Sequence, residues 1–491
     1  MRKYVNFCIV LLITVFFTGC GNRENVTEFM QSLRLDNRKE ARAADSDSII
    51  LSTEENADGM DITVTESTEV SLEKLVDMEE IKRTILENAA SEFTAEYPIN
   101  EAFLDWFSEE YNEEALQTIA QEVKKGSTDA NFWYDLTGNS IHVLWLSYCK
   151  DAGFKYQLEN VKWKTTASKE EITMAFTGDI NFSEGYVTTR YLDACENGIY
   201  DCFSADLLEL MQSMDIMMLN NEFTYSTRGT ALEGKAYTFR ADPSRVELLE
   251  TFGTDIVSLA NNHVYDFGPD ALLDTVSTLE QAGIPAIGAG KNLNEASEPY
   301  YFVCNGRKIA IVAATQIERS LNYTKEATED SPGVLKTLKP EKFVKVIEKA
   351  EKKSDYVIAF VHWGTEGDSN YGNDQVKLAE AFVEAGADAI IGGHTHCLQG
   401  FDIMNGVPII YSLGNFWFSK STQDTGLAKV TIDTKGELSL EFIPCIQKNL
   451  CTYLVTEADQ KKRILDFMQK HSALGVLVTQ DGKVEKTEEK Q

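Results

Sequence analysis

The stretch Ala389-Ile390-Ile391-Gly392-Gly393-His394-Thr395-His396 joins a short apolar run to two glycines and two histidines. An apolar run of this length, bounded by glycines, predicts a buried β-strand. The glycines allow the backbone to turn close to a ligand. On an extended chain the rings of His394 and His396 face the same side, because the side-chain period of a strand is two. The stretch therefore predicts a strand that ends in a pair of metal-binding histidines.

The same alternation continues on both sides of this stretch, where β-rich runs are separated by segments with helical spacing. This pattern predicts an α/β domain with much parallel sheet, and ligands bind such sheets at the carboxyl ends of the strands. The other predicted strands are 172–177, 217–219, 255–259, 308–314, 356–361 and 408–413, and the predicted helices are 269–282, 342–352 and 374–385.

Polar side chains follow these predicted strands closely. Asp179, Glu222 and His263 each come just after one, and His362 follows another. Four of the six histidines of the chain stand at such positions, and only His142 and His471 lie elsewhere. Imidazoles and carboxylates gathered at one sheet edge are the ligands that Zn, Mn or Fe take, so we interpret the cluster as a metal site. Each residue alone is more typical of a structural role.

Taken together, these motifs resemble the CapA family, which is linked to poly-γ-glutamate capsule synthesis and export. The resemblance covers residues 171–421, about half of the chain. The motifs that carry it are Thr177-Gly178-Asp179, Asn221-Glu222, Ala260-Asn261-Asn262-His263 through Asp266-Phe267-Gly268, Val361-His362-Trp363-Gly364, Gly393-His394-Thr395-His396 and Ile410-Tyr411-Ser412-Leu413-Gly414-Asn415-Phe416.

The resemblance implies a calcineurin-like metallophosphoesterase fold, an α/β/β/α sandwich, preceded here by a helical region. It also implies a divalent metal centre of Mn, Fe or Zn with one or two ions, in which His263 is the general acid. The implied metal ligands are Asp179, Asn262, His362, His394 and His396, and we add Glu222 as a further candidate ligand. The candidate catalytic residues are His263, Glu222 and Asp266.

The sequence departs from the phosphoesterase pattern at two positions. Asn181 stands where those enzymes have the histidine of Asp-x-His, and Asn221-Glu222 stands in place of their bridging aspartate. A centre with two metals, a centre with one metal and a site that only binds a ligand therefore all stay open.

The N-terminal residues predict export. Arg2 and Lys3 precede an apolar run that ends in Phe17-Thr18-Gly19-Cys20, which resembles the lipobox of bacterial lipoproteins. We expect a signal peptide over residues 1–20, lipidation of Cys20 and a lipid-anchored location on the extracellular face of the cell membrane. A plain secretory signal and an uncleaved anchor are the alternatives.

The rest of the chain divides by composition. Residues 21–75 are acidic and polar, which predicts a disordered tether. Residues 76–165 predict a helical domain whose aromatic residues form its core, with a ligand or partner surface as the alternative. The CapA-like domain is 171–421, and 422–491 predicts two strands, a helix and a charged tail. Seven cysteines follow Cys20, and their pairing stays open.

The formal net charge of -32 excludes nucleic acid as a favoured partner, because an acidic surface repels phosphate backbones. We expect a capsule synthesis or export protein that works beside a polymer synthase or export complex and takes an acidic polymer or a phosphoester as ligand. The alternative is a metal-dependent hydrolase of phosphoester or γ-glutamyl amide bonds at the cell surface.

Overall fold

The computed structural model describes residues 51–56, 59–64, 72–88, 97, 99–125, 131–317 and 323–487. The chain divides into two compact units, residues 1–78 and residues 79–491. The predicted signal peptide, Cys20 and the tether up to residue 50 lie outside the described residues. In the first unit β1 (Leu51–Asn56) and β2 (Gly59–Val64) form an antiparallel hairpin. The hairpin lies within the stretch predicted as a disordered tether, and its Thr, Ile and Val residues favour strands.

A helical region opens the second unit, as the sequence predicted. Its aromatic residues are core: Phe103 and Phe107 are fully buried, and Trp133 and Trp145 nearly so. No described helix is both long and apolar enough to span a membrane. The helices are α3 (Leu72–Asn88), α4 (Glu101–Tyr111), α5 (Glu113–Lys125), α6 (Phe132–Thr137) and α7 (Ile141–Asp151).

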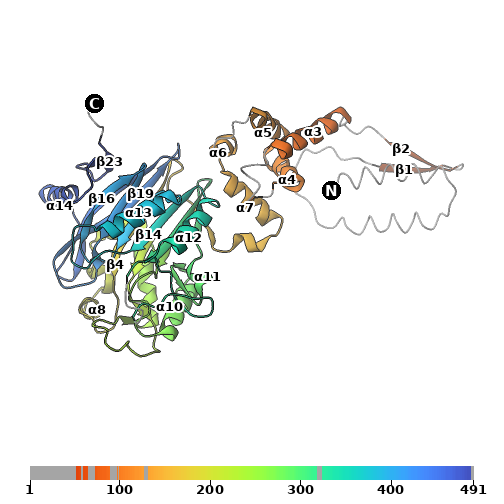
Figure 1. Cartoon of the computed structure of the whole chain (residues 1–491). Coiled ribbons are helices and arrows are strands. Elements are labelled where there is room, and N and C mark those ends of the chain that lie inside the picture. The colour runs from red at the N-terminus through yellow and green to blue at the C-terminus, as the bar shows by residue number, and fades with distance from the viewer. Residues whose placement is uncertain are drawn as a thin grey trace. The chain divides into compact units, whose positions relative to one another are not determined.

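Two large sheets follow, and Figure 1 shows them with their helices. A seven-stranded sheet has the order β16-β17-β15-β14-β12-β11-β3, with β12, β14, β15 and β17 parallel. Its strands are β3 (Val161–Trp163), β11 (Tyr300–Cys304), β12 (Arg307–Thr315), β14 (Tyr356–His362), β15 (Ala389–Gly393), β16 (Leu398–Met404) and β17 (Val407–Leu413).

An eight-stranded sheet has the order β21-β20-β19-β4-β5-β8-β9, and β18 also pairs with β4. β4, β5 and β8 are parallel to one another. The strands that the sequence set apart after residue 421 are hydrogen-bonded into this sheet beside β4. Its strands are β4 (Glu171–Ile180), β5 (Ile216–Asn221), β8 (Ile256–Ser258), β9 (Ala286–Ile287), β18 (Asn415–Trp417), β19 (Gln423–Asp433), β20 (Leu438–Lys448) and β21 (Cys451–Leu454).

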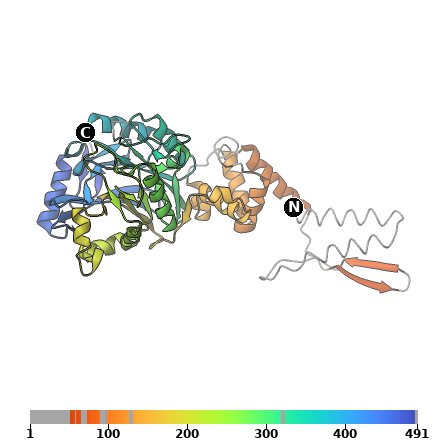
Figure 2. The ribbon, with the colours of Figure 1, turned by 90° about the horizontal axis from the view of Figure 1, so that it is seen from below.

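Three apolar layers show how the sheets stack. Alternate residues of β4 and β14, such as Phe176 and Phe360, meet in one core between the sheets. The outer face of the seven-stranded sheet packs against α12 (Glu341–Glu351) and α13 (Asn373–Glu384). The outer face of the other sheet packs against α9 (Ala205–Gln212) and α10 (Pro269–Gln281). The α/β/β/α sandwich expected from the resemblance is thus confirmed, and Figure 2 shows helices outside and strands between them.

Four aspartates hold the amino ends of the parallel strands together. Asp215, Asp255, Asp355 and Asp388 each directly precede a strand, β5, β8, β14 and β15. Each carboxylate accepts a hydrogen bond from a backbone N–H of the neighbouring strand, at 2.8, 3.1, 2.6 and 2.7 Å. Asp215 and Asp255 are buried and Asp355 and Asp388 are partly buried, and all four carboxylates are satisfied by the backbone that they join.

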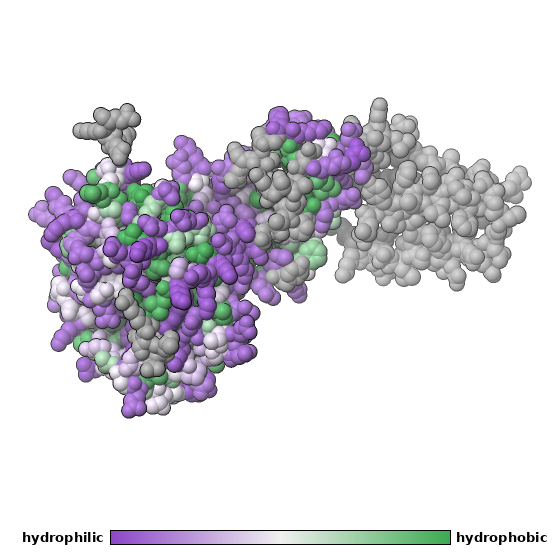
Figure 3. Space-filling model, in the orientation of Figure 1, coloured by the Kyte–Doolittle hydropathy of each residue, from purple (hydrophilic) through white to green (hydrophobic). Residues whose placement is uncertain are grey.

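The face of the molecule in Figure 3 is largely hydrophilic, with apolar residues scattered over it. The seven cysteines after Cys20 are free thiols. Two other helices of the α/β part are α8 (Val187–Leu192) and α14 (Ala458–Lys470).

Candidate metal centre

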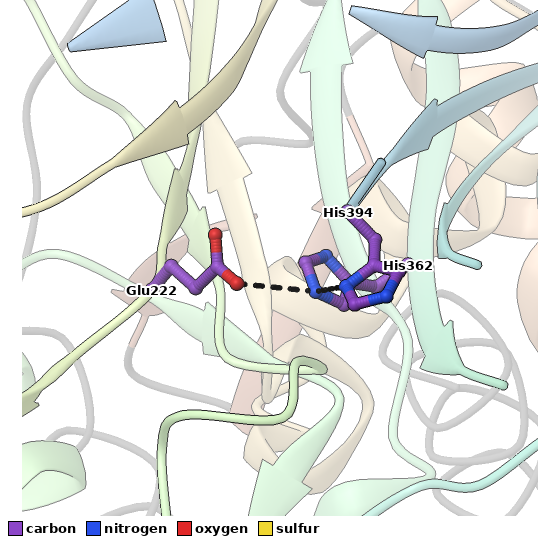
Figure 4. Close-up of side chains that lie close together, drawn as sticks. All are labelled: Glu222, His362 and His394. Carbon is purple, nitrogen blue, oxygen red and sulfur yellow. Dashed lines mark hydrogen bonds and ion pairs between the residues drawn. The ribbon is translucent and has the colours of Figure 1, made fainter. Parts of the chain in front are cut away.

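The carboxyl ends of the two sets of parallel strands meet at one place. Glu222 follows β5 of the eight-stranded sheet, whereas His362 ends β14 and His394 follows β15 of the seven-stranded sheet. Figure 4 shows the Glu222 carboxylate directed at the two imidazoles. Glu222 Oε1 lies 3.4 Å from His362 Nε2, and His394 Nδ1 lies 3.1 Å from that same nitrogen.

Hydrogen-bond acceptors outnumber donors around His362 Nε2. His362 Nε2 also lies 2.8 Å from Asn262 Oδ1. One imidazole N–H can donate to only one of the three acceptors around it: the Glu222 carboxylate, the Asn262 amide oxygen or the His394 nitrogen. Both oxygens of Glu222 are buried without any hydrogen-bond partner among the described residues. A cation satisfies such a donor set, so the residues present fit a divalent metal.

A second group of possible ligands shares Glu222. One ligand atom each from Glu222, His362 and His394 lie within 4.8 Å of one another, and the same holds for Asp179, Glu222 and His396. Asp179 Oδ2 is 3.2 Å from His396 Nδ1. The six candidate metal ligands thus lie close together, with Glu222 common to both groups and Asn262 in contact with His362.

Burial dominates the ionisation of this centre. It lowers the pKa of His362 to about 3 despite the opposing Asp179 charge. It also lowers the pKa of His394, where neighbouring imidazoles add to the effect. The Glu222 pKa is raised well above its usual value by burial and then by the Asp179 charge. The imidazoles therefore stay neutral at physiological pH, the form that binds a metal.

Asp179 and His396 each favour the charged form of the other. Burial alone raises the Asp179 pKa, but a hydrogen bond from His396 and the charge of His362 lower it overall. Burial alone lowers the His396 pKa, but Asp179 raises it overall. Asp179 Oδ1 accepts a 2.7 Å hydrogen bond from Asn220 Nδ2. This carboxylate therefore stays ionised without a metal.

The backbone that carries the two histidines is not the extended strand that the sequence predicted. β15 ends at Gly393, and His394 and His396 have φ of 94° and 57°. Left-handed φ at a residue with a side chain is uncommon and costs free energy, and it gathers at functional sites. The two rings still approach each other, with centroids 6.0 Å apart. Gly393 leaves room for Asp179, whose Oδ1 would lie 3.2 Å from a Cβ there.

His263 and Asp266 form a buried pair beside the metal ligands. His263 Nδ1 lies 2.7 Å from Asp266 Oδ2, and His263 Nε2 lies 4.0 Å from Glu222 Oε1. Because the Asp266 carboxylate accepts a hydrogen bond from Nδ1–H, the proton of the neutral ring stays on Nδ1. The Nε2 atom then faces the centre as an acceptor. Burial lowers the pKa of His263, and Asp266 opposes this. The three candidate catalytic residues therefore lie together at the centre.

Sequence reasoning missed several residues that support the site. Asn220, Asn261 and Asn415 are buried and hydrogen-bond Asp179, the His263 backbone and His396, respectively. Lys235 pairs with Asp266 at 2.6 Å. The signal for the asparagines was their place after strands, but a lone asparagine there is equally typical of a turn.

Comparisons with known proteins agree with the motifs. A family model described as bacterial capsule synthesis protein PGA_cap matches residues 173–420. The capsule biosynthesis protein CapA of Bacillus anthracis is 33% identical over 244 residues, which cover 48% of this chain and 58% of that protein. The PGA biosynthesis protein CapA of Bacillus subtilis is 30% identical over 286 residues, 57% of this chain and 72% of that protein.

Two further matches have lower sequence identity. A probable polyglutamine synthesis accessory protein of Mycobacterium tuberculosis is 28% identical over 208 residues, 41% of this chain and 55% of that protein. A crystal structure of 5'-nucleotidase from Candida albicans superimposes with a TM-score of 0.30 and 11% identity, over 57% of this chain and 52% of that one. The family model spans most strands of both sheets and every candidate metal-binding or catalytic residue, and the chain belongs to the bacterial capsule synthesis protein (PGA_cap) family.

Proposed function

We propose that the chain acts in the synthesis or export of a poly-γ-glutamate capsule, and that its centre is a metal-dependent hydrolase site for γ-glutamyl amide or phosphoester bonds. The observation that carries the proposal is Glu222, a buried carboxylate without hydrogen-bond partners among the described residues that is shared by two groups of possible metal ligands. The carboxylates of Asp215, Asp255, Asp355 and Asp388 accept backbone hydrogen bonds, whereas that of Glu222 does not. We therefore infer that the Glu222 carboxylate binds a cation.

The ligand residues divide between the two groups around Glu222. Asp179 and His396 would hold one divalent ion of Mn, Fe or Zn, and His362, His394 and Asn262 would hold another. Bound there, the metal supplies Lewis-acid polarisation of the scissile bond and a water of lowered pKa. Whether one ion or two is held follows from whether Glu222 bridges the groups.

His263 favours a hydrolase over a site that only binds. A metal needs no histidine whose Nδ1 is fixed by a carboxylate and whose Nε2 faces the centre at 4.0 Å from Glu222. That arrangement holds a proton at Nδ1 and leaves Nε2 free to take one up and pass it to a leaving group. His263 is therefore assigned the proton transfer and Asp266 the orientation of its ring.

A non-catalytic accessory role is the second candidate. It is favoured by Asn181, which replaces an imidazole of the phosphoesterase pattern, and by the accessory role in the name of the mycobacterial relative. In either role we propose a lipid anchor at Cys20, which would keep the protein on the outer face of the membrane beside a polymer synthase or export complex.

Metal analysis tests the centre itself. Mass spectrometry of the purified chain is expected to find one or two equivalents of Mn, Fe or Zn, which the double variant His394→Ala/His396→Ala loses. His471→Ala is the matched control, because its imidazole lies outside the centre, hydrogen-bonded to Asn370. A double variant that keeps its metal, or a folded wild type that takes up none, contradicts the proposal.

Hydrolysis assays separate the two roles. The metal-loaded chain is expected to cleave bis-p-nitrophenyl phosphate or γ-glutamyl-p-nitroanilide, and His263→Ala is expected to lose activity while it keeps its metal. The loss should be about 100-fold or more, the usual contribution of a general acid or base. A chain that binds metal and poly-γ-glutamate but cleaves neither probe nor the polymer supports the accessory role instead.

A further inference from the structure

The loop of residues 226–239 closes over the His263 motif. Its two ends are joined, because β6 (Thr224–Tyr225) and β7 (Arg240–Ala241) pair as short parallel strands. Most of its residues are exposed, and Tyr237 is 66% exposed. Such a loop has few apolar contacts of its own, so its position depends on the points at which it is attached.

Lys235 is the charged residue of this loop whose side chain is buried, since that side chain is only 7% exposed. Burial of an ammonium group is unfavourable unless its protons are accepted. Here Nζ donates to the backbone carbonyl of Asn262 and, at 2.6 Å, to Asp266 Oδ1. These two acceptors stand on either side of His263 in the sequence. One side chain thus bridges the segment that presents His263 to the centre.

The Asp266 carboxylate is fully engaged by this loop and by His263. Oδ1 accepts from Lys235, and Oδ2 lies 2.7 Å both from His263 Nδ1 and from the backbone nitrogen of Phe239. Leu232 also donates its N–H to the Asp266 carbonyl, at 2.9 Å. With both oxygens held, the carboxylate has one orientation left, and that orientation fixes the tautomer of His263.

A further contact comes from the ring of Phe239. Its centroid lies 4.4 Å from that of His263, at an angle of 45°. The loop therefore touches the imidazole as well as the carboxylate that orients it. The loop is more than a covering segment, because it holds the ring, the carboxylate and the backbone of the proton-transfer pair.

We propose that Lys235 is a positioning residue, which attaches the 226–239 loop to Asn262 and Asp266 and thereby holds the His263 ring in its working orientation. The proposal rests on the proposed function only in taking His263 as the group that transfers the proton. Lys235 itself touches neither the metal ligands' side chains nor a reacting atom, and it acts through Asp266 and the Asn262 backbone.

Hydrogen exchange of the full chain tests the attachment without any assay of activity. In Lys235→Met, peptides from residues 226–239 and 261–268 are expected to exchange about tenfold faster, while the rest of the sheet keeps its protection. Lys164→Met is the matched control, because Lys164 also pairs with a buried aspartate, Asp255, at 2.6 Å but belongs to another part of the fold. Unchanged exchange in Lys235→Met overturns the proposal.

Kinetics with bis-p-nitrophenyl phosphate and Mn²⁺ then separate positioning from simple stability. Lys235→Met is expected to keep the wild-type metal content and to lose about 100-fold in kcat with little change in KM, because only the proton-transfer group is misplaced. Lys235→Arg, which keeps the charge and the donors, is expected to recover part of the loss. A wild-type kcat in Lys235→Met, or a fall that tracks lost metal, overturns the proposal.

An inactive wild type would refute the hydrolase and still leave the inference testable. The ring Nδ1–H of His263 should give a slowly exchanging NMR signal in the wild type, because Asp266 accepts it in a buried site. We expect that signal to be lost in Lys235→Met and kept in Lys164→Met. A signal that persists in Lys235→Met shows that the ring is held without Lys235 and overturns the proposal.

Discussion

The aspartates at the amino ends of the parallel strands and Glu222 at the carboxyl ends differ in the hydrogen bonds that their carboxylates accept. At the amino ends, Asp215, Asp255, Asp355 and Asp388 each accept a backbone N–H from the neighbouring strand. At the carboxyl ends, the oxygens of Glu222 accept no hydrogen bond. Both sets lie in the same two sheets, so the difference comes from the local partners and not from the fold.

The comparison shows how a structural carboxylate can be told from a functional one. A buried charge that is fully hydrogen-bonded to the backbone joins two strands and adds to stability. A buried charge without partners destabilises the fold unless something outside the chain binds it. Burial does not separate Glu222 from the amino-end aspartates, whereas the hydrogen bonds accepted do; Asp179 and Asp266 at the centre accept hydrogen bonds as well.

Removal of an amino-end carboxylate is expected to cause the largest loss of stability. Asp355 Oδ2 accepts from the Lys308 backbone N–H at 2.6 Å and from Ser140 Oγ at 2.7 Å, so it also joins the helical region to the sheet. Asp355→Ala breaks both bonds and leaves a buried N–H without an acceptor, which we expect to lower the free energy of unfolding by about 4 kcal/mol.

Chemical denaturation with metal analysis in parallel checks this expectation. The metal content of folded Asp355→Ala should match the wild type, because the centre lies at the other end of the strands. Asp424→Ala, which removes the partner of the exposed Arg463, is the control and should change stability by less than about 1 kcal/mol. A loss of metal from folded Asp355→Ala would contradict the expectation that the amino-end aspartates do not affect the metal centre.

The second largest expected effect is a pH dependence of stability, to which Lys308 and Asp388 at the amino ends contribute in opposite directions. Burial, with the nearby Lys353, lowers the pKa of Lys308 to about 7, and burial raises the pKa of Asp388 to about 6. Between about pH 7 and 10.5 Lys308 is charged only in the unfolded chain, which therefore binds one proton more than the folded chain. Because of this difference, the contribution of Lys308 to stability rises with pH over that range. Asp388 makes stability fall from about pH 4 to 6, because the folded carboxyl keeps its proton longer.

Unfolding followed from pH 4 to 10 measures both slopes. The rise due to Lys308 should be on the order of 3 kcal/mol and the fall due to Asp388 on the order of 2 kcal/mol. Lys308→Met should remove the rise above pH 7, and Asp388→Asn should remove the fall below pH 6. A rise that survives in Lys308→Met would assign it to another group.

The sequence predicts the strands and helices of the sandwich well, because their apolar runs are local signals. β12, β14 and β15 and helices α10, α12 and α13 lie where their periodicity placed them. The position of β19 beside β4 is not local, since it depends on pairing across more than two hundred residues. Composition therefore separated β19, β20 and β21 from a sheet to which they belong.

The site was predictable in its members but not in its geometry. Each ligand candidate follows a strand, which the sequence shows, and the topology then brings the strand ends together. The central place of Glu222 was not visible, because it depends on the register of β4 and β5 and on the approach of the second sheet. The left-handed φ of His394 and His396 also lies beyond sequence reasoning, because a histidine takes this conformation in only a small minority of its occurrences.

The smallest expected change in stability, and the sharpest test of the comparison, is Glu222→Gln in the metal-free protein. Burial and the Asp179 charge raise the pKa of Glu222 well above its usual value, so the neutral form costs less there than in water, and glutamine has nearly the same shape as that form. We therefore expect stability to stay within about 1 kcal/mol of the wild type, or to increase slightly, although the side chain is fully buried. The same exchange at the other end, Asp355→Asn, should destabilise the fold, because a carboxylate that accepts two hydrogen bonds is lost.

Metal should reverse this order, and that reversal decides whether Glu222 is kept for a cation. Mn²⁺ at about 100 times its dissociation constant is expected to stabilise the wild type by about 2.7 kcal/mol, because only the folded chain binds it. Glu222→Gln should gain little, since it lacks the carboxylate common to both ligand groups, whereas Asp355→Asn should gain as much as the wild type. Equal stabilisation of all three would place the metal away from Glu222, and a marked loss of stability in metal-free Glu222→Gln would show that its carboxylate belongs to the structural kind.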